Sequence, residues 1–149
     1  MEPSIRRMTI QDVATVHAIN EAVTIGAWSE KLFADCIAVG YECWVLVKND
    51  EVIGFCVMNY AANEAHILSI SVHLDYQRQG LGQRLLNHLL ALAKANGAED
   101  IFLEVRSSNT SAINLYKKNN FVEVGVRKDY YPAEDDYPSE DAITMAAPL

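Results

Sequence analysis

The stretch from residue 65 to residue 97 constrains the fold most, because its hydrophobic period changes in the middle. In residues 65–74, apolar side chains alternate with serines and a histidine, which predicts a strand with one buried face. After a polar turn at 75–82, leucines recur at the spacing of one helical face, and Asn96-Gly97 is typical of a helix end. A strand followed at once by such a helix predicts a sheet with a helix packed on it.

The rest of the chain supplies further strands and helices. Thr9 and Ser29 are expected to open two helices, the first with Asp12 in a capping-box position, and a third helix is expected to begin within 107–110. Strands are expected at residues 4–8, 43–47, 52–60, 101–105, 121–126 and 142–146. The order β-α-α-β-β-β-α-β-α-β-β predicts an α/β (α+β) fold, a mixed sheet with helices on its faces.

The size and charge of the chain limit what it can bind. A chain of 149 residues is long enough to bury one core, and we expect residues 1–149 to form a single domain. With 12 basic and 20 acidic side chains, the net charge is −8. Such an excess of acid disfavours general binding of nucleic acid, which requires a basic face, and would attract a basic partner such as an arginine-rich peptide.

Neither the cysteines nor the histidines have the spacing of a metal site. Cys36, Cys43 and Cys56 form no C-x-x-C pair, so we expect free thiols rather than disulfides or a zinc site. The four histidines show no ligand spacing, and we expect no metal. No apolar run approaches the ~20 residues of a membrane span, and the first residues lack the pattern of a signal peptide. We therefore expect a cytoplasmic protein without membrane contact.

The polar turn carries the most specific local motif, Gln-Arg-Gln-Gly-Leu-Gly at residues 77–82. Glycines let the backbone approach a ligand closely, and the first amides of the next helix have no intrahelical acceptors, so this turn can hold a pyrophosphate. It is not a Walker loop, because Gln83-Arg84 follows Gly82, and it lacks the third glycine of a dinucleotide fingerprint. A tight turn without a ligand is the alternative.

This strand, turn and helix resemble the acyl-coenzyme A motif of the GNAT acetyltransferases. Several segments resemble one branch more narrowly, the RimI-type ribosomal-protein alanine N-acetyltransferases: residues 28–31, 75–82, 103–109, 130–132 and 140–143. Asn120 stands where the family usually has glycine, and the acidic insert 134–137 is individual to this chain. The resemblance implies the GNAT fold, a mostly antiparallel sheet of six to seven strands with about four helices on its faces.

The resemblance also implies an activity and a partner. The protein would transfer an acetyl group from acetyl-CoA to the N-terminal α-amine, on alanine, of the ribosomal small-subunit protein numbered eighteen. Its partner would be the basic N-terminal tail of that protein, with no direct nucleic-acid contact, and it would act as a monomer. The alternatives are an acetyltransferase of the same fold that acts on a lysine or a small amine, and a non-catalytic CoA-binding module.

Two side chains are candidates for catalysis by direct attack of the amine on the thioester. Glu104 lies in the otherwise apolar strand 101–105, whose alternation puts it on one face and puts Leu103 and Val105 on the other. A carboxylate becomes a better base in apolar surroundings, and Glu104 matches the position of the family's base. A solvated charge or a salt bridge to Arg106 is the alternative. Tyr116 matches the family's acid for the departing thiolate, and core packing under Phe121 is its alternative.

Ten residues are expected to hold acetyl-CoA, by backbone or side chain. The turn and the helix start would bind the pyrophosphate. The resemblance implies that the strand before them lines the acetyl and pantetheine arm and supplies N–H donors for the oxyanion. Asn109, two helical turns before Tyr116, would bind the pantetheine, or serve only as a helix cap. These residues are Ile70, Ser71, Val72, Arg78, Gln79, Gly80, Leu81, Gly82, Gln83 and Asn109.

Overall fold

A seven-stranded sheet runs through the computed structural model, which describes residues 2–149. Its order is β1-β2-β3-β4-β5-β7-β6, and all neighbours are antiparallel except β4 and β5. The strands are β1 (Ser4–Arg7), β2 (Glu42–Lys48), β3 (Glu51–Ala61), β4 (Glu64–Val72), β5 (Asp100–Arg106), β6 (Val122–Tyr131) and β7 (Glu140–Pro148). The α-helices are α1 (Val13–Val23), α2 (Glu30–Ala38), α3 (Leu81–Ala95) and α4 (Thr110–Lys118). The expected fold class is confirmed.

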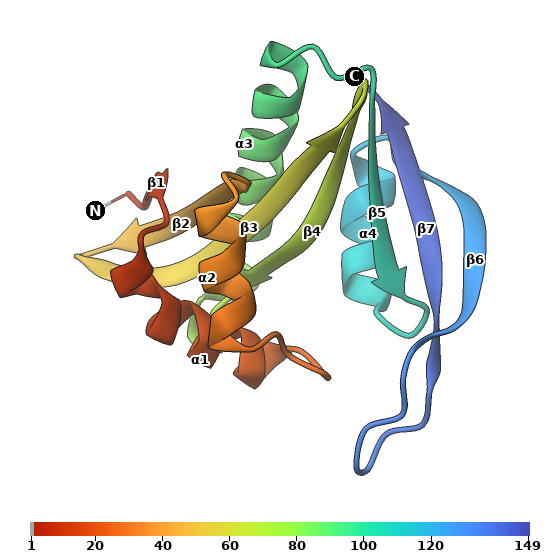
Figure 1. Cartoon of the computed structure of the whole chain (residues 1–149), viewed down its shortest axis with the longest axis horizontal. Helices are drawn as coiled ribbons and strands as arrows, with labels where there is room; N and C mark the ends of the chain where they lie inside the picture. The colour runs from red at the N-terminus through yellow and green to blue at the C-terminus, as the bar shows by residue number, and fades with distance from the viewer. Residues whose placement is uncertain (1) are drawn as a thin grey trace.

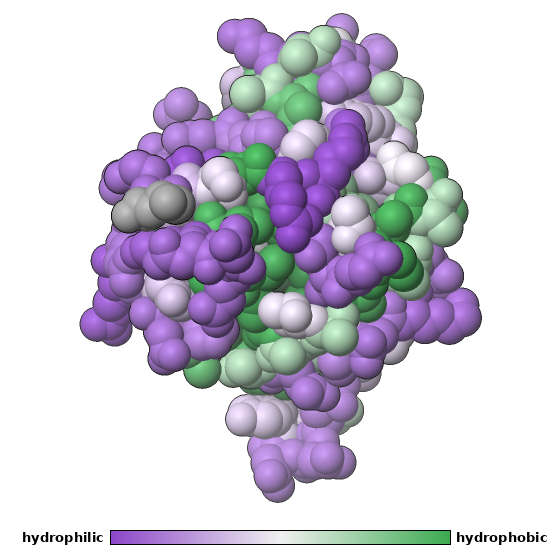
Figure 2. Space-filling view, turned by 90° about the vertical axis from the view of Figure 1, so that its left-hand side faces the viewer, coloured by the Kyte–Doolittle hydropathy of each residue, from purple (hydrophilic) through white to green (hydrophobic). Residues whose placement is uncertain are grey.

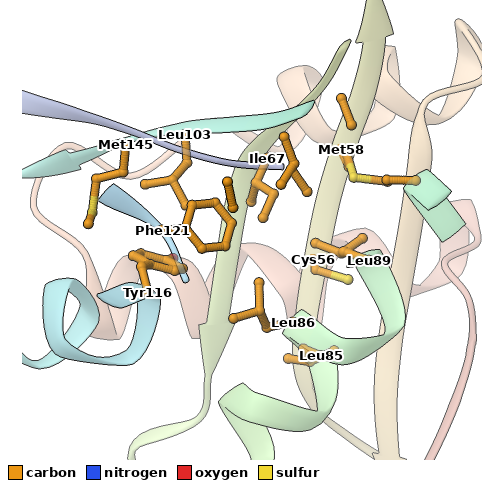
Figure 3. Close-up of a cluster of buried hydrophobic side chains, with 14 of the residues drawn as sticks. Cys56, Met58, Ile67, Leu85, Leu86, Leu89, Leu103, Tyr116, Phe121 and Met145 are labelled. Carbon is orange, nitrogen blue, oxygen red and sulfur yellow. The ribbon is translucent and has the colours of Figure 1, made fainter. Parts of the chain in front are cut away.

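α1 and α2 lie on one face of this sheet, and α3 and α4 lie on the other (Figure 1). α1 and α2 pack on β2, β3 and β4, around Phe33 and Phe55. α3 packs on the other side of β3 and β4, and α4 lies behind β5 and β7, around Leu85 and Leu103 (Figures 1 and 3). The apolar stripe of α3 and the alternation of β5 therefore face one core, as their sequence periods predict.

Short polar side chains begin three of the helices. Asp12 and Thr9 form a capping box at a 3-10 turn (Ile10–Asp12) that leads into α1. Ser29 Oγ accepts a hydrogen bond from Leu32 N at the start of α2, at 3.1 Å, and Asn109 caps α4. These caps satisfy backbone donors that have no acceptor inside the helix, which is why the sequence marks the helix starts so clearly.

A β-bulge in β4 corrects one prediction. Val57 pairs with Ser69 while Met58 pairs with Ile67, so Leu68 is the extra residue. Because a bulge shifts the alternation by one residue, Leu68 packs against the α1–α2 core whereas Ile70 and Val72 pack against the α3–α4 core. The single buried face expected for residues 65–74 is therefore wrong.

The chain also leaves β4 earlier than predicted. The strand ends at Val72, and Leu74 belongs to a 3-10 turn (Leu74–Tyr76) where it is 56% exposed. At the other end of the chain, β6 and β7 are longer than the predicted strands. α4 ends at Lys118 and is capped by Asn119. The next residue, Asn120, has a φ of +70°, the conformation that glycine usually provides after a helix.

The cysteines in the described structure are buried free thiols, as predicted. None of the helices within residues 2–149 combines the length and apolar composition that a membrane crossing requires. The same part of the chain contains no cluster of three or more His, Cys, Asp or Glu side chains suited to a metal ion.

Candidate active site

The parallel strands β4 and β5 pair at one end and diverge toward the other (Figure 1). Pairing stops at Ile67 and Leu103, directly before the bulge. Beyond this point lies a cavity of about 200 Å³, which we call the split cavity. Its lining comes from both layers of the molecule and includes Asn20, Thr24, Trp28, Ser69, Ile70, Ser71, Glu104, Arg106, Asn109, Tyr116 and Tyr131. Clefts beyond the carboxyl ends of parallel strands are common ligand sites.

Glu104 is the first residue of β5 beyond the paired segment, and its carboxylate is nearly enclosed, with 10% of the side chain exposed. Its neighbours Leu103 and Val105 point into the α3–α4 core, so the predicted alternation is confirmed. Oε1 of Glu104 lies 2.8 Å from Nε2 of His66. The alternative of a salt bridge to Arg106 is wrong, because Arg106 pairs with Glu140 instead, at 3.3 Å.

Tyr116 approaches the same cavity from the other face of the sheet. Its ring packs against Phe121, with centroids 5.5 Å apart, and the residue is 5% exposed (Figure 3). Core packing is thus confirmed, and the residue also lines the split cavity. Burial raises the pKa of Tyr116 above the usual value for a phenol. No other described side chain hydrogen-bonds its hydroxyl, which leaves that group free for a ligand.

Residues 77–83, the glycine turn, present their backbone outward. Gly80 has a φ of +77° and Arg78 a φ of +62°, and Gln77 Nε2 ties the turn to the strand by donating to Val72 O, at 3.0 Å. Within the described chain, the backbone N–H groups of residues 78–83 have no backbone acceptor. Consecutive free amides at a helix N-terminus are a favourable site for an anion.

The side chain of Gln83 points to α4 rather than into the glycine turn. It exchanges two hydrogen bonds with Asn119, at 2.7 and 2.9 Å, and so links the start of α3 to the end of α4. Gly82 also faces α4, since a Cβ there would lie 3.7 Å from Leu115 Cδ2. Of the polar groups that Gln83 could offer to a ligand at the turn, its backbone N–H remains free and its side chain does not.

The backbone of β4 faces the split cavity at alternate residues. His73 N–H donates to Ile53 O of β3, at 2.8 Å. Because donors alternate along an antiparallel strand, Ser71 N–H also points to β3, while the N–H groups of Ile70 and Val72 point to the side where β5 has diverged. The N–H groups of Ile70 and Val72 are therefore free of β3, and of the three predicted β4 residues Ile70 and Ser71 line the cavity.

Asn109 and Arg106 hold the segment between β5 and α4. Asn109 Oδ1 accepts from Ala112 N at 3.2 Å, which confirms a capping role, and the residue also lines the cavity. Arg106 donates to Ile25 O at 3.0 Å and stacks on Tyr131, 4.2 Å from the ring centroid. These contacts fasten the loop after α1 to the end of β5.

Glu140 completes this anchor from β7. Its Oε2 accepts from Ser108 N at 2.7 Å and from Ser107 Oγ at 3.3 Å, besides the ion pair to Arg106. The hydrogen bonds from Ser108, and then those from Arg106 and Ser107, hold the pKa of Glu140 below its ordinary value. The carboxylate thereby fixes the residues that lead into α4 and Tyr116.

A second cavity, of about 450 Å³, adjoins the first and is lined by acids. It shares residues 24–26 with the split cavity and adds Glu21, Glu134, Asp135 and Asp136. We call it the acidic cavity. Its outer wall is the loop between β6 and β7, the mostly hydrophilic lobe at the bottom of Figure 2. Gly26, with a φ of +67°, allows this close approach, because a Cβ there would lie 3.2 Å from Glu134 Oε1.

Some residues of the site were not predicted from the sequence. From the sequence, His66 is one of four histidines without metal-ligand spacing, and no motif assigns Asn20 a role in the site. Asn20, almost fully buried, accepts from Trp28 N at 2.9 Å and donates to Thr24 at 3.3 Å. A polar residue within an apolar helix stripe was a usable signal for Asn20. His66 gave none, because its partner is 38 residues away.

Comparison with known proteins gives consistent matches. Residues 14–121 match the model described as the acetyltransferase (GNAT) family. The [ribosomal protein bS18]-alanine N-acetyltransferase of Escherichia coli is 37% identical over 146 residues, 98% of this chain and 97% of that protein. The crystal structure of the E. coli ribosomal-protein-S18-alanine N-acetyltransferase matches with a TM-score of 0.90 at 36% identity, and covers 99% of this chain and 94% of that one.

Two further solved structures have the same fold. Ard1 of Thermoplasma volcanium has a TM-score of 0.92 at 29% identity, covering 100% of this chain and 99% of that one. A GNAT acetyltransferase of Elizabethkingia anophelis, solved with acetyl-CoA bound, has a TM-score of 0.80 at 22% identity, covering 99% and 98% of the two chains.

Proposed function

The chain belongs to the GNAT acetyltransferase family, and from this premise we propose that it acetylates the N-terminal α-amine of a ribosomal protein, at a terminal alanine, with acetyl-CoA as donor. The observation that carries the proposal is that Glu104 and Tyr116 line one cavity from opposite faces of the sheet. The substrate is supported by the 37% identity, over nearly the whole of both chains, to the E. coli enzyme named for bS18 alanine.

The glycine turn fits the pyrophosphate of acetyl-CoA. The free amides of Arg78, Gln79, Gly80, Leu81, Gly82 and Gln83 would bind its oxygens. Gly80 and Gly82 have no side chain that would block the approach of these oxygens. Asn109, which lines the split cavity, would contact the pantetheine arm. The bound molecule supplies an activated thioester, whose carbonyl oxygen would face the N–H groups of Ile70 and Val72 as negative charge develops on it.

Glu104 would serve as the base. A terminal α-amine has a pKa of about 7.7–8.0, so roughly a tenth of it is neutral near pH 7, whereas a lysine amine at about 10.4 is almost fully charged. One carboxylate acting through a water therefore suffices for an α-amine. The side chain of Glu104 is 10% exposed and lines the split cavity, where such a water would lie.

Tyr116 would donate the proton that the departing thiolate takes up. A phenol is protonated at neutral pH, and burial raises the pKa of Tyr116 further, which makes it a weaker acid. A phenol is a weaker acid than a thiol in water, with values of about 10 and 8.5, so this transfer depends on close placement. The apolar packing against Phe121 gives Tyr116 that fixed placement.

The acidic cavity would receive the positively charged part of the substrate tail. The acidic cavity, lined by Glu21, Glu134, Asp135 and Asp136, shares residues 24–26 with the split cavity. The net charge of the chain is −8. A basic peptide would be attracted to this side, mainly through faster association. We also propose that the protein acts as a monomer in the cytoplasm.

The proposal is tested by mass spectrometry on two arginine-rich peptides that begin with alanine. One has a free α-amine, and the other has a blocked α-amine and an internal lysine. Acetylation of the first alone is expected. Acetylation of the blocked peptide would redirect the assignment to lysine. If neither is modified although acetyl-CoA binds, N-terminal acetylation is overturned in favour of a small amine or a non-catalytic module.

A further inference from the structure

We infer that His66 is a positioning residue for Glu104, which holds the carboxylate in the orientation that proton abstraction requires. This inference rests on the proposed role of Glu104 as base. It adds a residue on β4 to a reaction whose other groups come from β5, α4 and the glycine turn.

The two residues meet because of where the parallel strands stop pairing. His66 belongs to the paired segment, opposite Phe102, whereas Glu104 is the first residue of β5 beyond it. Both point away from the α3–α4 core, since Ala65, Ile67 and Leu103 fill that core. The contact between Nε2 of His66 and Oε1 of Glu104, at 2.8 Å, therefore links the first residue of β5 that no longer pairs with β4 to the segment of β4 that still pairs with β5.

The hydrogen bond leaves one oxygen of the carboxylate free. A carboxylate only accepts, so Nε2 of His66 carries the proton and donates to Oε1. No other described residue hydrogen-bonds Glu104, and Oε2 remains for the amine or its water. The terminal torsion of a glutamate is broad, so one fixed oxygen removes most of the rotational freedom of the other. Fixed orientation of a base accounts for part of its rate advantage.

Other groups near Glu104 do not compete for this position. Arg106 is engaged by Ile25, Glu140 and the ring of Tyr131. Asn20 is engaged by Trp28 and Thr24. Conversely, the ring of His66 makes no hydrogen bond to a described residue other than Glu104, and 37% of its side chain is exposed. Among the described residues, Glu104 is thus the one hydrogen-bond partner of the His66 ring.

Two substitutions of His66 separate positioning from folding. We expect His66→Ala to lower kcat about tenfold on the free-amine peptide, with an unchanged KM for acetyl-CoA. His66→Gln places an amide donor near the position of Nε2, and we expect it to restore kcat to within about threefold of the wild type. A merely structural role would not predict this rescue. Wild-type kcat in His66→Ala overturns the inference, as does a His66→Gln variant no faster than His66→Ala.

A double-mutant cycle shows whether His66 acts through Glu104. In a Glu104→Gln background, we expect His66→Ala to cause less than a twofold further loss, because the group it positions is already absent. A full tenfold loss there overturns the inference. The cycle also separates the two claims: unchanged turnover in Glu104→Gln alone removes the proposed base. A slow Glu104→Gln beside a fully active His66→Ala overturns only the role of His66.

Discussion

The split cavity lies beside the end of β4, and the glycine turn follows β4 in the chain. The turn offers backbone groups to a ligand, whereas the cavity offers mainly side chains. The turn offers backbone amides from one continuous run of residues, 78–83. The cavity offers side chains from elements spread from Asn20 to Tyr131. One region depends on local backbone conformation, and the other on how distant elements pack.

This difference implies that binding and chemistry can be damaged separately. Backbone amides cannot be removed by ordinary substitution, so the turn is sensitive only to changes that alter its φ and ψ angles. The cavity is sensitive to removal of single functional groups whose packing neighbours stay in place. Substitutions at the cavity should lower kcat, and substitutions at the turn should raise KM for acetyl-CoA.

The largest effect is expected for Glu104→Gln. Losing a general base lowers rates by about 10²–10⁴-fold, and we expect kcat to fall at least 100-fold. The dissociation constant for acetyl-CoA, measured by calorimetry, should stay within about twofold, because the glycine turn is untouched. Glu64→Gln, an exposed change on the neighbouring strand, is the control and should leave both constants unchanged. A large loss of acetyl-CoA binding in Glu104→Gln would contradict the separation of chemistry in the split cavity from binding at the glycine turn.

Tyr116→Phe should have the next largest effect, with a fall in kcat of about tenfold or more. The ring and its contact with Phe121 remain, so the melting temperature should hardly change. Because the pKa of Tyr116 is raised, its hydroxyl stays protonated past pH 10, and activity that needs this proton is lost only as pH rises above that value. The prediction is contradicted if the wild-type rate declines with rising pH at a value below 10 and this decline is missing from the pH–rate profile of Tyr116→Phe.

A smaller effect, on binding, is expected for Gly80→Ala. Alanine at a φ of +77° costs about 1 kcal/mol, and relaxation of the turn would disturb its amides. We expect KM for acetyl-CoA to rise about fivefold with little change in kcat. Gly40→Ala is a matched control, since Gly40 has a φ of +84° and open space around it but lies far from the turn in sequence. Equal KM changes in both variants would show a general loss of stability instead.

The smallest effect is expected for Glu140→Gln, and it concerns stability. The pKa of Glu140 is lower in the folded protein than in the unfolded chain, where it is about 4.3. Its contribution is therefore present above that value and is lost as pH falls through the lower, folded value. We expect the variant to be less stable by about 1–2 kcal/mol at pH 7.

Thermal unfolding at pH 7, 5 and 3 checks this prediction. The gap in melting temperature between wild type and Glu140→Gln should be widest at pH 7 and should narrow at the lowest pH. A gap that stays constant across this range would mean that the hydrogen bonds to Ser107 and Ser108 do not depend on the charge of Glu140. The glycine turn holds no such carboxylate, so Gly80→Ala should show no comparable pH dependence.

The sequence by itself determined the features that rest on nearby residues. The caps at Thr9 and Ser29, the apolar stripe of α3 and the glycine turn all involve contacts within about one helical turn or one strand alternation. The orientation of Glu104 away from the core follows from the same alternation. Such features are readable because the physical cause lies within a few residues of the effect.

Only the tertiary structure decided which groups meet at the site. Because of the bulge, Leu68 packs against the α1–α2 core instead of the α3–α4 core that Ile70 and Val72 contact. No residue near Leu68 in the sequence predicts this change of face. The partner of Glu104 is His66, not Arg106, because β4 and β5 run side by side although 38 residues separate the two. Arg106 in turn pairs with Glu140, 34 residues away. These pairings depend on the register of packed strands, which is set by the whole core rather than by any one segment.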